Sequence, residues 1–164
     1  MAAPNSLDNE TFTSAMHGAI AGLFATVPMT VVMKGIRQQL PFWQRGRLPP
    51  EQITMEMAEK IDIAKDLDRD ERKALTLAGH FGYGAMSGSA YGAFAEQVRL
   101  PPMLGGAGFG LAVWAASYLG WLPVAGVRRS ATQEPAGTNL MMIASHLVWG
   151  ITTAHAYESL RSRK

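Results

Sequence analysis

The sequence predicts an all-α protein, an integral membrane four-helix bundle made of two helical hairpins. Residues 11–33, 74–95, 100–127 and 135–157 contain no Asp, Glu, Lys or Arg, although 17% of the chain is charged. A helix of about 20 residues crosses the hydrocarbon core of a bilayer, whereas a soluble helix keeps charges on its outer face. The mean hydropathy of +0.02 suits the alternative of a soluble helical bundle. The charge-free windows favour the membrane protein.

We expect a single membrane domain over residues 1–164. Its spans are predicted at about 14–38, 74–97, 103–125 and 138–158. The loop at about 39–73 has its own signals, because Pro49-Pro50-Glu51 is typical of a helix start. Ile53, Met57 and Ile61 recur every fourth residue after it, which predicts a short amphipathic helix. Asp68, followed three residues later by Glu71, has the spacing of a capping box at the start of the second long helix.

The distribution of basic residues predicts the topology. An even number of spans places both termini on one side, and most of the 15 Lys and Arg residues then fall on the other side. By the positive-inside rule the large loop is cytoplasmic and both termini lie outside. The first residues carry no Lys or Arg, unlike a secretory signal, so the first apolar segment is expected to stay as an anchor. The basic residues on the terminal side are Arg99, Arg161, Arg163 and Lys164.

The second and fourth predicted spans resemble each other. His80-Phe-Gly-Tyr-Gly84 matches His146-Leu-Val-Trp-Gly150, and Tyr91 and Tyr157 follow the two histidines at the same offset. In the first and third spans, Gly18 and Gly22 correspond to Gly106 and Gly110. Two hairpins that enter the membrane in the same sense would form a parallel internal repeat. Chance similarity between glycine-rich helices is the alternative.

Glycines at four-residue spacing predict close contacts between helix backbones. They serve either packing within one chain, or a surface that joins copies into a homo-oligomer or admits a lipid tail. Pro28 removes a hydrogen bond in the middle of the first span and predicts a kink there, which neighbouring helices accommodate or which acts as a hinge. The predicted packing glycines are Gly18, Gly22, Gly84, Gly88, Gly92, Gly106 and Gly110.

Histidines and tyrosines are the polar-site candidates within the spans. His80 and His146 are expected at a similar depth, and His17 and His155 at the outer level. Three interpretations stay open: a bis-histidine haem site, a metal or proton-handling pair, and ordinary hydrogen bonding between helices. His146 and His155 fall on opposite faces of their helix, which disfavours two stacked haems in one bundle. Tyr91 and Tyr157 complete the candidates.

Composition and motifs exclude several function classes. The chain has no cysteine, so disulfides and thiolate chemistry are excluded, and its net charge of +2 without clustered basic residues makes nucleic acid an unexpected partner. No span holds paired carboxylates, and no phosphate-binding, dinucleotide or zinc motif is present. We therefore expect no catalytic residues, no metal and no cofactor. The expected partners are the bilayer, a second copy of the chain and a small molecule that the sequence does not identify.

Some segments resemble the YagU-like family of small bacterial inner-membrane proteins, which is defined by a domain of unknown function. The resemblance rests on SHLVWG at 145–150, HFGYG at 80–84 and the small-residue first span. PPEQIT at 49–54 and GLAVWAASYLGWLP at 110–123 are similar to a branch of such proteins. The resemblance implies a multi-pass protein of the bacterial inner (plasma) membrane and imports no reaction. The expected role is a transport, stress-response or assembly factor that is not an enzyme, and the alternative is a haem- or metal-binding membrane module.

Overall fold

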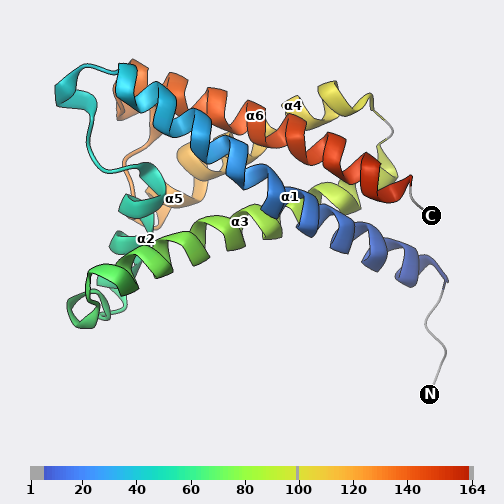
Figure 1. Ribbon diagram of the computed structural model, residues 1–164, viewed down its shortest axis with the longest axis horizontal. Helices are drawn as coiled ribbons and strands as arrows, with labels where there is room; N and C mark the ends of the chain where they lie inside the picture. Colours follow the sequence, from blue (N-terminus) through green and yellow to red (C-terminus); the bar gives the residue numbers. More distant parts are fainter. Residues whose placement is uncertain (1–5, 99, 163–164) are drawn as a thin grey trace.

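The computed structural model describes residues 6–98 and 100–162, and every regular element in these ranges is helical (Figure 1). The long helices are α1 (Ser6–Gln39), α3 (Arg69–Gln97), α4 (Pro102–Ala115) and α6 (Ala136–Arg161). A π-helical turn, Ala116–Trp121, continues α4 into α5 (Leu122–Val124), and α2 (Pro49–Lys60) lies between α1 and α3. Short 3-10 turns are Phe42–Gln44, Ala64–Asp66 and Ala131–Gln133. The predicted all-α class is confirmed.

The long helices form two antiparallel hairpins that share one interface. α1 packs on α3, α4 packs on α6, and α1 also packs along α6, whereas α3 makes few contacts with α4 or α6. The start of α1 and the end of α6 lie at one end of the molecule, and α2 and α5 lie toward the other (Figure 1). α1 therefore holds the two hairpins together.

Two of the described helical segments are long and apolar enough to cross a membrane. They are Asn9–Gln39 in α1 and Pro102–Val124, which runs from α4 to α5. In their most apolar windows only 33% and 22% of the residues are buried. α3 and α6 have 29 and 26 residues, long enough for a span, but neither contains an 18-residue stretch that is apolar enough to be a candidate.

Glycines bring the backbones of α1 and α3 into direct contact. A methyl group added at Gly22 would lie 2.7 Å from the Cα of Gly88, and one added at Gly18 would lie 2.9 Å from the Cα of Gly92. Real side-chain carbons do not approach backbone atoms this closely. These glycine faces are thus covered within one chain and are not free to contact a second copy.

The second hairpin uses the same kind of crossing in a different register. A methyl group added at Gly150 would lie 2.9 Å from the Cα of Gly110, while the methyl position of Gly84 lies closest to the Thr26 side chain. Matching Gly84 with Gly150 therefore pairs Thr26 with Gly110. When the two hairpins are compared through these contacts, Gly110 corresponds to Thr26. The sequence predicted that Gly110 corresponds to Gly22, so the observed correspondence is shifted by one helical turn.

Several hydroxyl groups are bonded within their own helix. The hydroxyl of Thr26 donates to the carbonyl of Gly22 at 2.8 Å, and that of Thr30 to the carbonyl of Thr26 at 2.7 Å. Ser145 and Thr153 in α6 likewise donate to the carbonyls four residues earlier, at 2.7 and 2.8 Å. α1 is continuous from Ser6 to Gln39 with Pro28 inside it, so the proline does not end the helix.

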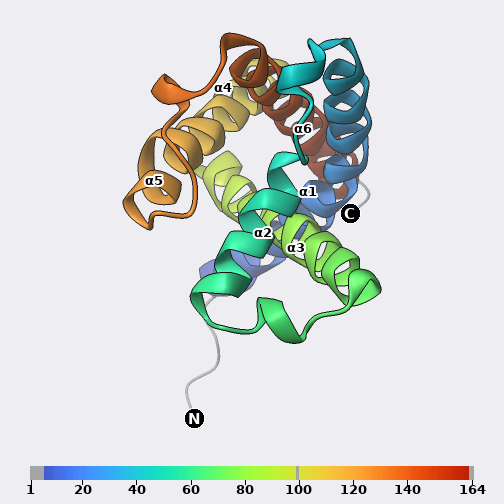
Figure 2. The ribbon, with the colours of Figure 1, turned by 90° about the vertical axis from the view of Figure 1, so that its left-hand side faces the viewer.

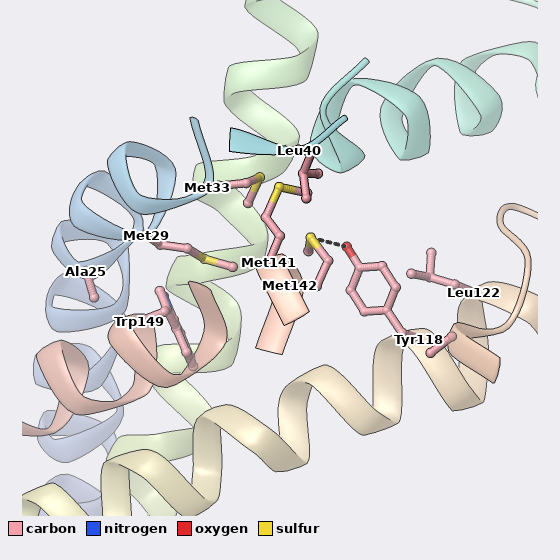
Figure 3. Packing of buried hydrophobic residues seen from close by; sticks show 10 residues of the cluster. Ala25, Met29, Met33, Leu40, Tyr118, Leu122, Met141, Met142 and Trp149 are labelled. Atoms are coloured by element: carbon pink, nitrogen blue, oxygen red, sulfur yellow. Dashed lines mark hydrogen bonds between the residues drawn. The ribbon is translucent and has the colours of Figure 1, made fainter. Parts of the chain in front are cut away.

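The larger apolar cluster lies where α1, α6 and the π-helical turn meet (Figure 3). Met29 and Met33 of α1 point toward Met141 and Met142 of α6, and Trp149 fills the space beneath them (Figure 3). Methionine side chains are flexible and fill irregular gaps. This cluster joins the two hairpins mainly through thioethers and one indole ring.

Trp149 supplies a buried polar link between the hairpins. Its indole Nε1 donates a hydrogen bond to the carbonyl oxygen of Gly22 at 3.0 Å, and the side chain is only 2% exposed. We expect Trp149→Phe to lower the free energy of unfolding by about 1 kcal/mol or more, because a buried hydrogen bond and some packing are lost. Thermal melting followed by circular dichroism measures this. Trp43→Phe, at a ring that is 72% exposed, is the control and should leave the melting temperature unchanged.

Candidate functional site

A cavity of about 710 Å³ lies between the hairpins and is the candidate site. α1, α3, α6 and the π-helical turn form its walls, and α2 covers one side; Figure 2 looks onto this end of the molecule. His80 and His146 both line it. Most of the remaining lining is apolar, and it includes the methionines Met29, Met33, Met57, Met86 and Met142. The structure thus brings the two predicted histidines to one cavity.

The hydrogen bond of His146 fixes which ring nitrogen carries the proton. Nδ1 lies 2.8 Å from the carbonyl oxygen of Met142, and the side chain is buried in α6. A carbonyl oxygen only accepts hydrogen bonds, so Nδ1 is the donor. In the neutral ring Nε2 then holds a lone pair that can accept a hydrogen bond or bind a metal.

His80 is held in the opposite tautomer. Its Nε2 lies 3.1 Å from the hydroxyl oxygen of Thr30, and that hydroxyl already donates its proton to the carbonyl of Thr26. The Thr30 oxygen must therefore accept from His80, which makes Nε2–H the donor and leaves the lone pair on Nδ1. Each histidine thus has one nitrogen fixed by α1 or α6 and one available as an acceptor.

A second pair of polar groups borders the cavity opposite α1. The hydroxyl groups of Tyr83 and Ser117 lie 2.8 Å apart, joining α3 to the π-helical turn. Ser117 is buried, and the neighbouring Tyr118 donates weakly to the sulfur of Met142 at 3.9 Å. Sequence reasoning missed these residues. Tyr83 and Ser87 follow His80 at helical spacing, and this periodicity could have identified the lining face of α3.

The predicted amphipathic helix is present as α2, and it packs on the cavity. Ile53 and Met57 of its apolar stripe line the cavity, whereas Ile61, the third member, is 67% exposed just after the helix ends. The predicted capping box at the start of α3 is also present: Asp68 accepts from the backbone N–H groups of Asp70 and Glu71, and the Glu71 side chain accepts from the Asp68 N–H. These two features position the loop that covers the site.

The capping box predicts a pH-dependent stability. The backbone N–H groups of Glu71 and Asp70 hold the pKa of the Asp68 carboxyl below its ordinary value. The folded protein favours the charged Asp68 carboxylate. The stabilisation of the fold by this carboxylate is therefore present above the ordinary pKa of the group, and it is lost as the pH falls through the lowered pKa of the folded state. We expect Asp68→Ala to melt at a lower temperature than the wild type at neutral pH, with a gap that shrinks below about pH 4.

Melting curves of both proteins over this pH range test the prediction. Asp66→Ala removes a nearby exposed acid that caps no helix, and it should melt like the wild type throughout. A gap between Asp68→Ala and the wild type that keeps its size at low pH would contradict the role given to the Asp68 carboxylate.

Tyr91 and Tyr157 lie apart from the cavity, toward the end of the molecule where α1 starts and α6 ends. Their rings pack edge to face with centroids 5.7 Å apart. The Tyr157 hydroxyl and the Ser14 hydroxyl both donate to Glu96, at 2.9 and 2.7 Å. The tyrosines therefore join α1, α3 and α6 in a separate polar cluster. They do not share a site with the histidines.

The outer histidines do not form a second site in the described part of the chain. His155 is exposed and His17 is half-buried, and no hydrogen bond or ring contact joins them there. Within residues 6–98 and 100–162, no group of three or more His, Asp or Glu side chains is placed to hold a metal ion. Of the four histidines, only His80 and His146 would meet a ligand in the cavity.

Comparisons of the chain with protein-family models, with curated proteins and with solved structures found no match. The resemblance to the YagU-like family therefore stays a prediction.

Proposed function

We propose that this chain is a four-span membrane protein that binds an apolar small molecule in the cavity between its hairpins. The distribution of side chains on α1 supports the membrane position. Phe24 and Val31 are 60% and 64% exposed, whereas Ala25 and Thr26 are 0% exposed. A helix with its largest apolar side chains outside and small or polar ones inside suits a hydrocarbon solvent.

The other helices support the same position. Met86 of α3 and Leu104 of α4 are 62% and 65% exposed, within windows that lack charges. A core helix of a soluble protein would be mostly buried, unlike the two most apolar segments of this chain. We place α1, α3, α4 with its continuation, and α6 across the bacterial inner membrane.

The proposed topology puts the large loop in the cytoplasm and both termini outside, following the basic residues. Of the basic residues on the terminal side, Arg99, Arg163 and Lys164 lie outside the described residues. We also propose membership of the YagU-like family.

The cavity supports binding of a lipophilic molecule that carries a hydrogen-bond donor. The free nitrogens of His80 and His146 are acceptors in an otherwise methionine-rich lining. Met57, Met86 and Trp121 line the cavity and are also 46%, 62% and 38% exposed, so it opens toward the surface. A ligand can therefore enter from the bilayer. Nothing in the lining suggests bond-breaking chemistry, and the proposed role is that of a carrier or assembly factor.

A matched pair of glycine variants tests ligand binding. Gly82 lines the cavity and Gly108 does not, and a Cβ atom added at either position meets no atom within 4 Å. We expect Gly82→Phe to block the cavity and Gly108→Phe to leave it open. The probe is a dibrominated long-chain alcohol, whose bromines quench the nearby Trp121 and Trp149 fluorescence in detergent solution. Equal quenching of both variants and the wild type would contradict the proposal. Carbonate washing of membranes tests the membrane position separately.

A haem- or metal-binding module is the second candidate, since both histidines line one cavity. His146 donates through Nδ1 to a carbonyl and keeps Nε2 free, which is typical of a metal ligand. His80 has the reverse arrangement, so it could bind only through Nδ1 or by releasing Thr30. The absorbance spectrum and metal content of the purified protein test this candidate. A haem band that is lost in His146→Ala would favour it over the lipophilic ligand.

A further inference from the structure

A second and more polar cavity lies near the end of the molecule that holds α2. It has a volume of about 320 Å³ and is bordered by the end of α1, the start of α2 and the loop before α6. Trp43 lines it and is 72% exposed, and the adjacent Phe42 is 80% exposed. It is separate from the histidine cavity, because the two share no lining residue.

Arginine dominates the charge of this second cavity. Arg37, Arg47, Arg128 and Arg129 line it together with a single acid, Glu134. Glu134 pairs with Arg128 at 3.2 Å. Arg37 donates only to the backbone carbonyls of Arg45 and Gly46, both at 2.8 Å, so no carboxylate neutralises it. Arg47 pairs with Glu51, which lies outside the lining, at 3.5 Å. The surplus of positive charge in the lining thus comes from Arg37 and Arg129.

Other features of the cavity wall add donors. α6 begins at this cavity, and it has no side-chain hydrogen bond at its N-cap. Free N–H groups at a helix start favour anions. The Arg128 side chain is only 9% exposed, and its Nε atom is buried without a hydrogen-bond partner. An oxyanion in the cavity would supply the missing acceptor.

We propose that this cavity binds the phosphate group of an anionic membrane lipid. Arginines form strong hydrogen bonds to phosphate oxygens, and basic pockets on the cytoplasmic side of membrane proteins bind lipid headgroups. The exposed rings of Phe42 and Trp43 are suited to the interface between headgroups and hydrocarbon. They favour a lipid over free phosphate as the source. The inference rests on the proposed membrane position and does not require a ligand in the histidine cavity.

Calorimetric titration of the full chain in an uncharged detergent tests the proposal. The probes are dioctanoylphosphatidylglycerol, dioctanoylphosphatidylcholine and inorganic phosphate. We expect the anionic lipid to bind at least about tenfold more tightly than either of the others. The double variant Arg47→Gln/Arg129→Gln should weaken its binding by about tenfold or more. Both arginines are exposed, so the variant should fold, as its melting curve will show.

The control variant Lys34→Gln/Arg69→Gln removes the same charge from exposed positions outside the cavity, and it should bind the lipid like the wild type. Equal weakening in both double variants would mean general attraction to a basic surface and would overturn the proposed site. Inorganic phosphate that binds as tightly as the lipid would overturn the lipid assignment. Loss of membrane association in carbonate washes would instead overturn the membrane position, so the two failures can be distinguished.

Discussion

Replacing Gly22 with leucine is expected to prevent stable folding of the bundle. The added side chain would begin 2.7 Å from the Cα of Gly88, where rigid backbone cannot move aside as a flexible side chain could. The Gly22 carbonyl also accepts the hydrogen bond of Trp149, so separation of α1 from α3 disturbs the contact with α6 as well. The combined loss should exceed about 4 kcal/mol, beyond the range of ordinary core substitutions.

The yield and melting temperature of the purified variant measure this effect. Gly35→Leu is the matched control, because it adds the same side chain to the same helix at a position where an added Cβ atom meets no atom within 4 Å. Gly22→Leu that melts within about 2 °C of Gly35→Leu would show that the α1–α3 crossing is wrong. By the same reasoning, Gly88→Leu should destabilise the chain itself rather than separate a homo-oligomer.

Replacing Arg128 with methionine is expected to have the second largest effect. The guanidinium lies 3.2 Å from Glu134, donates to the side chain of Gln52 and sits 5.8 Å from the centre of the Tyr118 ring. Arg128 thus fastens the loop before α6 to α2 and to the π-helical turn. Removing it leaves the Glu134 carboxylate, only 17% exposed, without its partner. Breaking one partner of such a pair costs about 3–5 kcal/mol.

Chemical or thermal unfolding of three variants tests this prediction. Arg129→Met removes the neighbouring exposed arginine and should change stability by less than about 0.5 kcal/mol. Arg128→Met combined with Glu134→Met should recover most of the loss, since no buried charge stays unpaired. Equal stability of Arg128→Met and Arg129→Met would show that the ion pair does not stabilise the fold.

The helices were the most predictable part of the structure, because absence of charge and local end signals are properties of the sequence alone. Asp68 with Glu71 starts α3 as predicted, and Pro49 starts α2. The apolar stripe of α2 indicated a buried face but not what it covers. That depends on contacts between residues far apart in the chain, such as Met57 with the wall of the histidine cavity.

The register of the two hairpins could not be predicted for a physical reason. Glycine recurs every fourth residue on both helices of the first pair, so a slide by one turn replaces a glycine contact with another glycine contact. Side chains beyond the glycines, such as Thr26 opposite Gly84, select among these arrangements. Tyr91 and Tyr157 each follow a histidine by eleven residues. This spacing within single helices does not reveal how the helices pack, so it did not predict that the two tyrosines pack on each other away from the histidines.

The hydroxyl groups bonded within single helices bear on how the protein is made. Thr26, Thr30, Ser145 and Thr153 each have an acceptor four residues earlier, so none depends on another helix for its own proton. In the proposed membrane, these four hydroxyl groups therefore have their acceptors before the helices pack together. α1 is synthesised long before α6, which later supplies the Trp149 indole to the Gly22 carbonyl. For these four hydroxyl groups, insertion and assembly can thus proceed as separate steps, whereas the contact of Trp149 with Gly22 forms only at assembly.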